Sequence, residues 1–259
     1  MRTTELVRRV ATASGAGLSL AGDLLLGACC PGCERPGLGL CPGCRAVLMQ
    51  RRPRPTSPDP PPPGFPLCIT TGPYDAQLRR LVVAVKEDQV LLVTPVLGRL
   101  LAAALEAVVG PLGAVDPRAE PVLVVPVPSA PAAVRRRGYD ATDAMARDAV
   151  RRLRRSGNAV RRRRLLRVAR RVADQSELGA IERALNLDGA YAAVPGRGRV
   201  VVVDDLVTTG ASLTEAARAL RTGGWTVVGA AVVAATVRRT PAAGRTVVTS
   251  VVPPVGDNP

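Results

Sequence analysis

Three mostly apolar runs in the second half of the chain predict buried strands. They cover residues 122–127, 200–203 and 226–235 and are rich in Val, which is typical of strands covered on both faces in a parallel sheet. An amphipathic stretch, residues 213–220, lies between the second and third runs. A helix between two such strands forms a βαβ unit, so the pattern predicts an α/β fold with a parallel sheet flanked by helices.

Further patterning divides the chain into segments. Helical spacing of apolar residues recurs over residues 78–85 and 140–153, and we expect a helix over about residues 5–26 to pack on a cysteine-rich module. Residues 51–66 contain eight prolines, which favours an extended linker. We therefore expect an N-terminal helix and cysteine module over 1–50, the linker over 51–66, the main domain over 67–237 and a frayed tail over 238–259.

Composition excludes several classes of enzyme. The 259 residues include no His, which rules out Ser-His-Asp and Cys-His catalysis and any His-ligated metal. Only one Phe, one Trp and three Tyr are present, so the core must be built from Val, Leu and Ala. No run of about 18 continuous apolar residues occurs, and we expect no membrane span.

The run at residues 200–203 continues into the most informative motif of the chain. Asp204 and Asp205 follow where the strand is expected to end. The turn before the amphipathic stretch then reads Val207, Thr208, Thr209, Gly210, Ala211 and Ser212. Backbone N–H groups of such a turn, with the positive end of the helix dipole, face a phosphate, and Gly210 lets the backbone approach closely. The two carboxylates lie where hydroxyls or a hydrated Mg²⁺ are held beside that phosphate.

A phosphate at one end of this motif and a diol at the other indicate a ribose 5-phosphate. The alternative is an ordinary buried strand with an acidic cap on the helix that follows. That alternative explains the apolar run but not the paired Asp and the Thr-Thr-Gly together.

Five of the six cysteines fall within residues 29–44. Two Cys-Pro-Gly-Cys knuckles supply Cys30, Cys33, Cys41 and Cys44. Four thiolates suit a closed, structural Zn²⁺ site, with two disulfides as the alternative and Cys29 able to replace Cys30 as a ligand. The first 28 residues loosely resemble a lipoprotein signal, but acidic residues interrupt the pattern. We expect a cytoplasmic protein, in which paired cysteines bind metal more often than they form disulfides.

The net charge of +15 is carried almost entirely by Arg. Residues 151–171 hold eleven Arg and no acidic residue, which is typical either of a solvated face or of a surface that attracts nucleic acid or polyphosphate. Arg135 and Arg137 lie in an expected loop after the first apolar run, which is either a site that suits a diphosphate or an ordinary solvated loop. Lys86 is the one Lys among 36 basic residues, so either a compact ammonium is needed there or chance left it.

The segment 200–212 resembles the phosphoribosyl-diphosphate (PRPP) signature of type I phosphoribosyltransferases. Together with motifs in unbroken order over residues 22–236, it makes the chain similar to the ComF family, phosphoribosyltransferase-like proteins linked to DNA uptake in naturally competent bacteria. The motifs that carry this resemblance are the paired knuckles, Tyr74-Asp75, Lys86, the Val-Pro-Val-Pro of residues 125–128, Arg137-Gly138-Tyr139, Arg170, Gln175, Glu182-Arg183, Asn186 and the segment 200–212.

The resemblance implies a role for each motif. Asp204 and Asp205 would lie by the ribose hydroxyls, the 207–212 turn would wrap the 5-phosphate, and Mg²⁺ would bind with PRPP. The basic residues Arg135, Arg137 and Lys86 would hold the diphosphate. The segment with Arg170, Gln175 and Arg183 resembles the flexible catalytic loop that closes over substrate and excludes water.

Two departures from the family pattern lie in the expected diphosphate loop. The family's Asn-Gln after the aromatic residue is Asp140-Ala141 here, and its Leu-His after Val-Pro-Val-Pro is Ser129-Ala130.

Two functions are therefore expected, one enzymatic and one not. The first is transfer of the phosphoribosyl group from PRPP to a nitrogenous base or amine, a pentosyl glycosyltransferase reaction that requires Mg²⁺. The alternative is a competence factor without catalysis that binds a nucleotide, single-stranded DNA or the DNA-uptake machinery; a zinc-ribbon nucleic-acid regulator is a third hypothesis. A homodimer is compatible with each of these.

Overall fold

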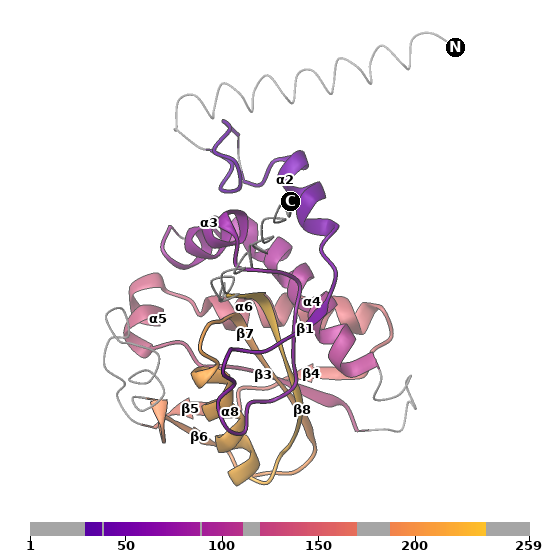
Figure 1. The fold of residues 1–259 in the computed structure, drawn as a ribbon, viewed down its shortest axis with the longest axis vertical. Coiled ribbons are helices and arrows are strands. Elements are labelled where there is room, and N and C mark those ends of the chain that lie inside the picture. The colour runs from indigo at the N-terminus through magenta and orange to yellow at the C-terminus, as the bar shows by residue number, and fades with distance from the viewer. Residues whose placement is uncertain (1–28, 38, 89, 111–119, 170–186, 237–259) are drawn as a thin grey trace, which may run out of the picture.

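The computed structural model describes residues 29–236 except 38, 89, 111–119 and 170–186. Within this part a six-stranded sheet has the order β1-β2-β8-β7-β3-β4 (Figure 1). Its strands are β1 (Arg54–Thr56), β2 (Cys68–Thr70), β3 (Val122–Pro126), β4 (Val160–Arg162), β7 (Arg199–Val207) and β8 (Thr226–Ala235). Neighbouring strands are parallel except β1 with β2. The α/β fold with a mostly parallel sheet is thus confirmed.

Helices cover both faces of this sheet. The helices of the described residues are α2 (Pro42–Met49), α3 (Ala76–Lys86), the 3-10 helix η1 (Leu91–Val93), α4 (Thr94–Val109), α5 (Pro131–Arg137), α6 (Ala141–Arg155) and α8 (Ala211–Thr222), of which α4, α6 and α8 pack on the sheet. Val201 and Val203 of β7 share a core with α4 and α6, whereas Val200 and Val202 share one with α8, because successive strand residues point to opposite faces. A separate antiparallel pair, β5 (Leu166–Val168) and β6 (Tyr191–Ala193), contacts α8.

The apolar helix at residues 91–109 is a core element. Leu91–Val109 is long and apolar enough by composition to cross a membrane, but 61% of that stretch is buried inside the protein. Helix α4 packs against α6 and β8. Core packing therefore accounts for its composition, because a helix that is apolar on most sides is buried on most sides.

Strand β7 is longer than the apolar pattern predicts. We expected it to end before Asp204, but its pairing with β8 continues to Val207, which lies opposite Ala235. Asp204 and Asp205 are therefore residues of the strand, near its carboxyl end. Two neighbours on a strand present their side chains to opposite faces of the sheet.

Two segments that were predicted to be irregular contain regular structure. Arg135 and Arg137 lie in the last turn of α5, not in a loop. Pro131 begins that helix and Gly138 ends it in a left-handed conformation (φ 75°), and these are the positions that the two residue types favour. Within the Pro-rich segment, residues 54–56 form the edge strand β1, which is where a sheet tolerates proline.

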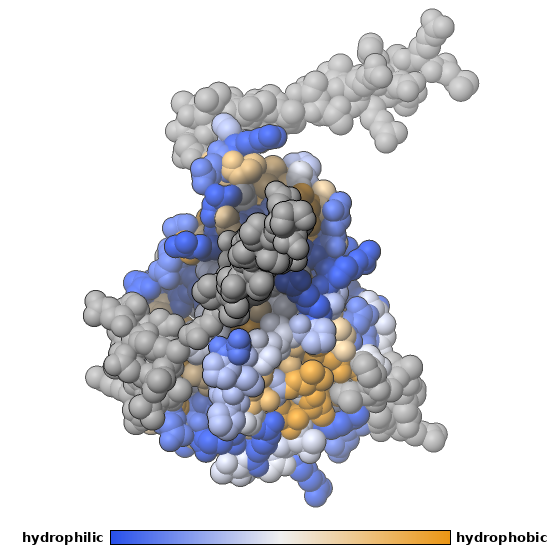
Figure 2. Space-filling view, in the orientation of Figure 1, coloured by the Kyte–Doolittle hydropathy of each residue, from blue (hydrophilic) through white to orange (hydrophobic). Residues whose placement is uncertain are grey.

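The Pro-rich segment lies across the front of the sheet in Figure 1. Figure 2 shows the same face, where this segment forms a pale, weakly polar band beside a hydrophobic area. The domain boundaries at residues 50, 66 and 237 stay a prediction. The helix expected over residues 5–26 and the tail over 238–259 lie outside the described residues.

Candidate ligand site and metal centre

Four cysteines of the N-terminal module bring their sulfurs together. The Sγ atoms of Cys30, Cys33, Cys41 and Cys44 all lie within 4.8 Å of one another, and those of Cys33 and Cys41 are 3.7 Å apart. A tetrahedral Zn²⁺ with Zn–S bonds of about 2.3 Å separates its sulfurs by roughly 3.8 Å. The residues therefore fit a structural Zn²⁺. Cys29 is exposed and does not belong to this cluster.

Backbone donors support the sulfurs of the cluster. The N–H groups of Cys41 and Gly32 donate to Cys30 Sγ at 3.3 and 3.4 Å. Burial raises the pKa of the Cys30 thiol, but these donors outweigh it and lower the pKa to about 6. The thiolate is the form that binds a metal ion, and hydrogen bonds to sulfur fix its orientation. A Zn²⁺ ion held there would supply a crosslink for the module and no catalytic chemistry.

The cysteine module is docked on helix α3. Leu48 of α2 is fully buried in the same core as α3 and α4. Arg80 of α3 donates to the carbonyl oxygen of Gly32 at 3.0 Å. Arg51 pairs with Asp75, the N-cap of α3, at 2.6 Å. The module thus holds the same helix that carries Lys86 at its other end.

The pKa values of the two neighbouring carboxyl groups of β7 are shifted in opposite directions. Asp205 is 2% exposed; burial raises its pKa, but Lys86 outweighs this and leaves the pKa below the usual range. Burial and the nearby Asp205 raise the pKa of Asp204 well above its usual range. Asp204 Oδ1 also accepts a hydrogen bond from the Asp205 N–H at 2.9 Å. Lys86 therefore favours the ionised form of Asp205, and that charge in turn disfavours ionisation of Asp204.

Lys86 is the partner of Asp205. Its Nζ lies 2.7 Å from Asp205 Oδ2. Burial lowers the pKa of Lys86, but the carboxyl groups of β7 outweigh burial and raise it. Two side chains from the α5–α6 region hold the end of α3: Tyr139 donates to the Val85 carbonyl, and Arg137 Nη1 donates to the Lys86 carbonyl at 3.4 Å. The ammonium group is therefore delivered from a fixed helix end.

The turn after β7 leads into the N-terminus of α8, where the Ala211 N–H donates to the Thr209 hydroxyl at 3.4 Å. Gly210 has φ 78° and is the N-cap residue of α8, so no side chain occupies the cap position. Helix N–H groups in the first turn lack intrahelical partners and attract anions. Residues 207–212, with Leu187, Leu206 and Leu213, line a small recess of about 30 Å³. This is the segment in which the sequence predicted phosphate binding.

Arg135 and Arg137, the other basic residues predicted to hold the diphosphate, differ in exposure. Arg135 is exposed on α5. Arg137 is buried, and its Nε donates to the Ala133 carbonyl at 3.1 Å, so in this conformation it braces α5 and the end of α3. Arg170, Gln175 and Arg183 lie outside the described residues.

The two departures from the family pattern contact each other. The Ser129 hydroxyl donates to Asp140 Oδ1 at 2.9 Å. The same oxygen accepts from the Asp143 N–H at 3.2 Å and so caps helix α6. The substituted pair therefore serves a local structural purpose between β3 and α6.

Sequence reasoning named Tyr74 and Tyr139 only as parts of motifs and assigned no site role to any aromatic residue. Burial and the Asp205 carboxylate raise the pKa of Tyr74, and burial and Asp204 raise that of Tyr191, so each lies beside one carboxyl. Phe65 lies against Gly210. All three Tyr and the single Phe of the chain thus lie beside the end of β7, the turn at residues 207–212 or the helix that carries Lys86. Their scarcity was the signal that could have identified them.

The arginine-rich segment forms a groove away from this site. It is an open groove of about 590 Å³, and its lining is Arg147, Val150, Arg151, Arg154, Arg155, Arg161, Arg162 and Arg163, from α6 and the β4 region. Two buried carboxylates offset part of the charge. Asp143 pairs with Arg147, Arg162 and Arg164, and Asp148 pairs with Arg151 and Arg152.

Comparison with known proteins bears on the main domain. Residues 145–252 match the family model of the phosphoribosyl transferase domain. The match includes most of α6 and all of β7, the turn at residues 207–212, α8 and β8, so the chain carries a domain of this kind. No curated protein matches the chain.

Proposed function

We propose that the protein binds PRPP or a related ribose 5-phosphate nucleotide and transfers the phosphoribosyl group to a nitrogenous base or amine. The observation that carries this proposal is the end of β7. There Asp205 paired with Lys86, its neighbour Asp204 and a helix N-terminus with glycine at its cap position follow one another within nine residues. The phosphoribosyl transferase match over the same residues supports it.

Each group has a role in this proposal. The N–H groups of the 208–212 turn and the Thr and Ser hydroxyls bind the 5-phosphate. The carboxyl groups of Asp204 and Asp205 accept hydrogen bonds from the ribose hydroxyls. Arg135 and Lys86 lie on the side of the leaving diphosphate, and Lys86 binds as a point charge.

The reaction needs positioning more than a protein nucleophile. The bond between C1 of the ribose and the diphosphate oxygen breaks, and diphosphate leaves with the electron pair. A nitrogen of the acceptor forms the new bond to C1 and releases a proton to solvent or diphosphate. Fixed cations beside the leaving group stabilise the charge that develops there, which is consistent with a chain that has no His.

Magnesium is part of the proposal as a companion of PRPP. The oxygens of Asp204 and Asp205 are the hard donors that Mg²⁺ prefers, and a cation would relieve the repulsion that raises the pKa of Asp204. Bound there, the ion would neutralise charge on the diphosphate.

A diphosphate-release assay tests this function. Purified protein with PRPP and Mg²⁺ should release diphosphate when one member of a panel of bases and amines is added. Binding of PRPP should also raise the melting temperature. Absence of both effects at millimolar PRPP would contradict the proposal, whereas stabilisation without turnover would support a binding protein.

We further propose a ComF-type setting, in which a cytoplasmic protein, with zinc in its cysteine module, acts in DNA uptake. The order of the motifs along the chain supports this setting. A second candidate function, binding of single-stranded DNA without catalysis, is favoured by the arginine groove. A homodimer is compatible with both functions.

A further inference from the structure

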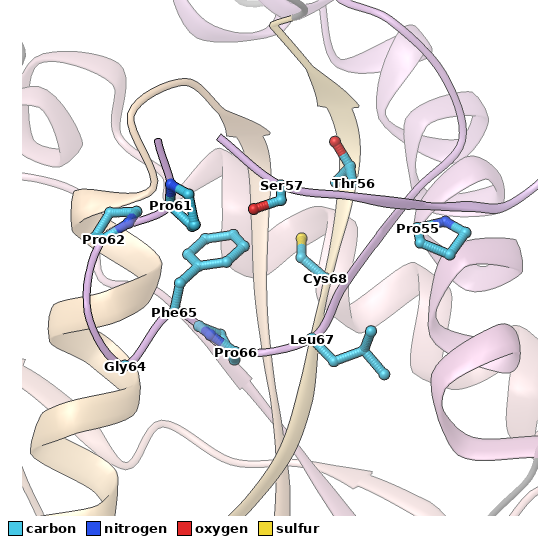
Figure 3. Close-up of a pocket in the computed structure, with 10 residues that line it drawn as sticks. All are labelled: Pro55, Thr56, Ser57, Pro61, Pro62, Gly64, Phe65, Pro66, Leu67 and Cys68. Carbon is cyan, nitrogen blue, oxygen red and sulfur yellow. The ribbon is translucent and has the colours of Figure 1, made fainter. Parts of the chain in front are cut away.

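The Pro-rich strap, residues 51–66, is fastened to the main domain at both ends of its loop. Strand β1 pairs with β2 from Arg54 to Thr56. Farther along, Arg221 at the end of α8 donates to the Gly64 carbonyl at 3.0 Å. Pro58 and Pro66 are buried although most of the strap is exposed. The loop therefore crosses the face of the sheet that carries α8 (Figure 3).

Phe65 of the strap lies directly against residues 207–212, the turn that we propose binds phosphate and that is called the phosphate turn below. A Cβ atom placed on Gly210 would be 2.8 Å from Phe65 Cε2 and 2.8 Å from Pro58 Cγ. Real Cβ atoms do not approach other atoms this closely, so the space beside Gly210 is filled by the strap. Gly210 also has φ 78°, a conformation that glycine adopts without strain.

The turn has a second support on its other side. Thr236, just after β8, donates its N–H to the Val207 carbonyl at 2.9 Å, and its hydroxyl lies 3.5 Å from the Thr208 carbonyl. Thr208 itself is exposed. The phosphate turn is thus held between the end of β8 and the Phe65–Pro58 pair.

The far side of Phe65 is open. A pocket of about 540 Å³ is lined by strap residues and by the start of β2. In Figure 3 the Phe65 ring points into the space between Ser57 and Cys68. The ring is therefore held by its contact with the turn and by the strap backbone, and the pocket leaves room for a hydroxyl group on the ring.

We infer that Phe65, with Pro58, is a positioning residue that holds the phosphate turn in its binding geometry. Glycine has the largest conformational freedom of any residue, so without a neighbour in van der Waals contact the N–H groups of residues 209–212 no longer converge. The strap is in this respect a wall of the ligand site, not a passive connection. The inference on ligand affinity rests on the proposed function; the inference on turn geometry does not.

The first experiment uses the free protein and needs no ligand. Hydrogen–deuterium exchange of the peptide that contains residues 208–212 is compared in wild type, Phe65→Ala and Leu67→Ala. Leu67 lines the same pocket, is 63% exposed and serves as the matched control. Exchange should rise at least roughly tenfold in Phe65→Ala, as local opening becomes easier, and stay unchanged in Leu67→Ala. Equal exchange in wild type and Phe65→Ala would overturn the inference.

The second experiment measures the affinity for ribose 5-phosphate by calorimetry. Phe65→Ala should bind roughly tenfold more weakly, because small misplacements of binding groups have effects of this size. Phe65→Tyr should bind as wild type does, since its added hydroxyl enters the open pocket. Leu166→Ala, in the same buried core on β5, controls for a general loss of stability.

The outcomes separate the two proposals. Equal weakening in Leu166→Ala and Phe65→Ala would show a merely structural effect and overturn the positioning role. If wild type binds neither ribose 5-phosphate nor PRPP, the proposed function fails, and the exchange experiment alone decides whether Phe65 holds the turn.

Discussion

At the scale of single residues, Asp204 and Asp205 are neighbours whose pKa values are shifted in opposite directions. The raised pKa of Asp204 means that the folded protein binds its proton more tightly than the unfolded chain. Stability from this group is full below the ordinary carboxyl pKa and declines as the pH rises to the folded pKa. The lowered pKa of Asp205 has the reverse effect: its stabilisation is present above the ordinary carboxyl pKa and is lost as the pH falls through the folded pKa.

Substitution by Asn should therefore change stability in opposite directions. At pH 7, Asp204→Asn should raise the melting temperature by about 2–4 °C, the size of a 1 kcal/mol gain in a protein of this length, and the Asn oxygen keeps the bond from the Asp205 N–H. Asp205→Asn should lower it, because Lys86 loses its partner. Both variants should weaken PRPP binding. Scanning calorimetry at pH 7 and pH 4 measures the melting temperatures. A melting temperature below that of wild type for Asp204→Asn at pH 7 would contradict the prediction.

Substitutions of Lys86 test whether ligand binding requires a compact ammonium group at this position. Lys86→Arg keeps the charge but replaces a compact ammonium with a wider planar fork, in a place bounded by Asp205 and the fixed end of α3. Lys86→Arg and Lys86→Ala should each weaken PRPP binding by about tenfold or more, since both lose the point charge at this position. Titration calorimetry decides the matter. An Arg variant that binds as wild type does would mean that the single Lys is an accident of composition.

At the scale of elements, periodicity predicted the core strands and helices but not their ends. The expected helix at 78–85 is α3, and that at 140–153 is α6. The end of β7 was misjudged because pairing with β8, a tertiary contact, keeps Asp204 and Asp205 in the strand. The turn between β7 and α8 could be predicted because its residue types and order are local, whereas its binding of phosphate stays a prediction. The Phe65–Gly210 contact could not, because no local pattern joins residues 145 positions apart.

Helix α3 depends on its N-cap, and this gives a prediction. Asp75 Oδ1 accepts from the Leu78 N–H at 2.9 Å, and Oδ2 pairs with Arg51 at 2.6 Å. Asp75→Ala loses the cap and should destabilise the fold by about 1 kcal/mol. Asp75→Asn keeps an acceptor for the cap and should lose less. Urea unfolding measures both, and equal losses would show that the ion pair with Arg51, not the cap, holds the helix start.

At the scale of the whole molecule, the cysteine module and the main domain share one core. Cys30, Cys44 and Leu48 belong to the cluster that includes α4 and α6. Cys30→Ser should release zinc. A structural zinc ion supplies on the order of 10 kcal/mol of folding free energy in small modules, and this stabilisation would be lost. Because the cores are continuous, we expect the melting temperature of the main domain to fall as well. Elemental analysis and a thermal scan test this; native protein without zinc would refute the metal assignment.

The last prediction concerns the arginine groove and the charge of the whole molecule. A chain with net charge +15 attracts any polyanion, so the question is whether the groove of α6 and β4 adds to this general field. Arg161 and Arg163 are exposed and line the groove. Replacing both with Ala should weaken binding of a single-stranded oligonucleotide and reduce the slope of log affinity against log salt by about one to two units. The control is the double variant Arg45→Ala with Arg52→Ala, which removes the same charge from exposed residues outside the groove. If the two double variants weaken binding equally, net charge alone attracts DNA and the groove has no special part in it.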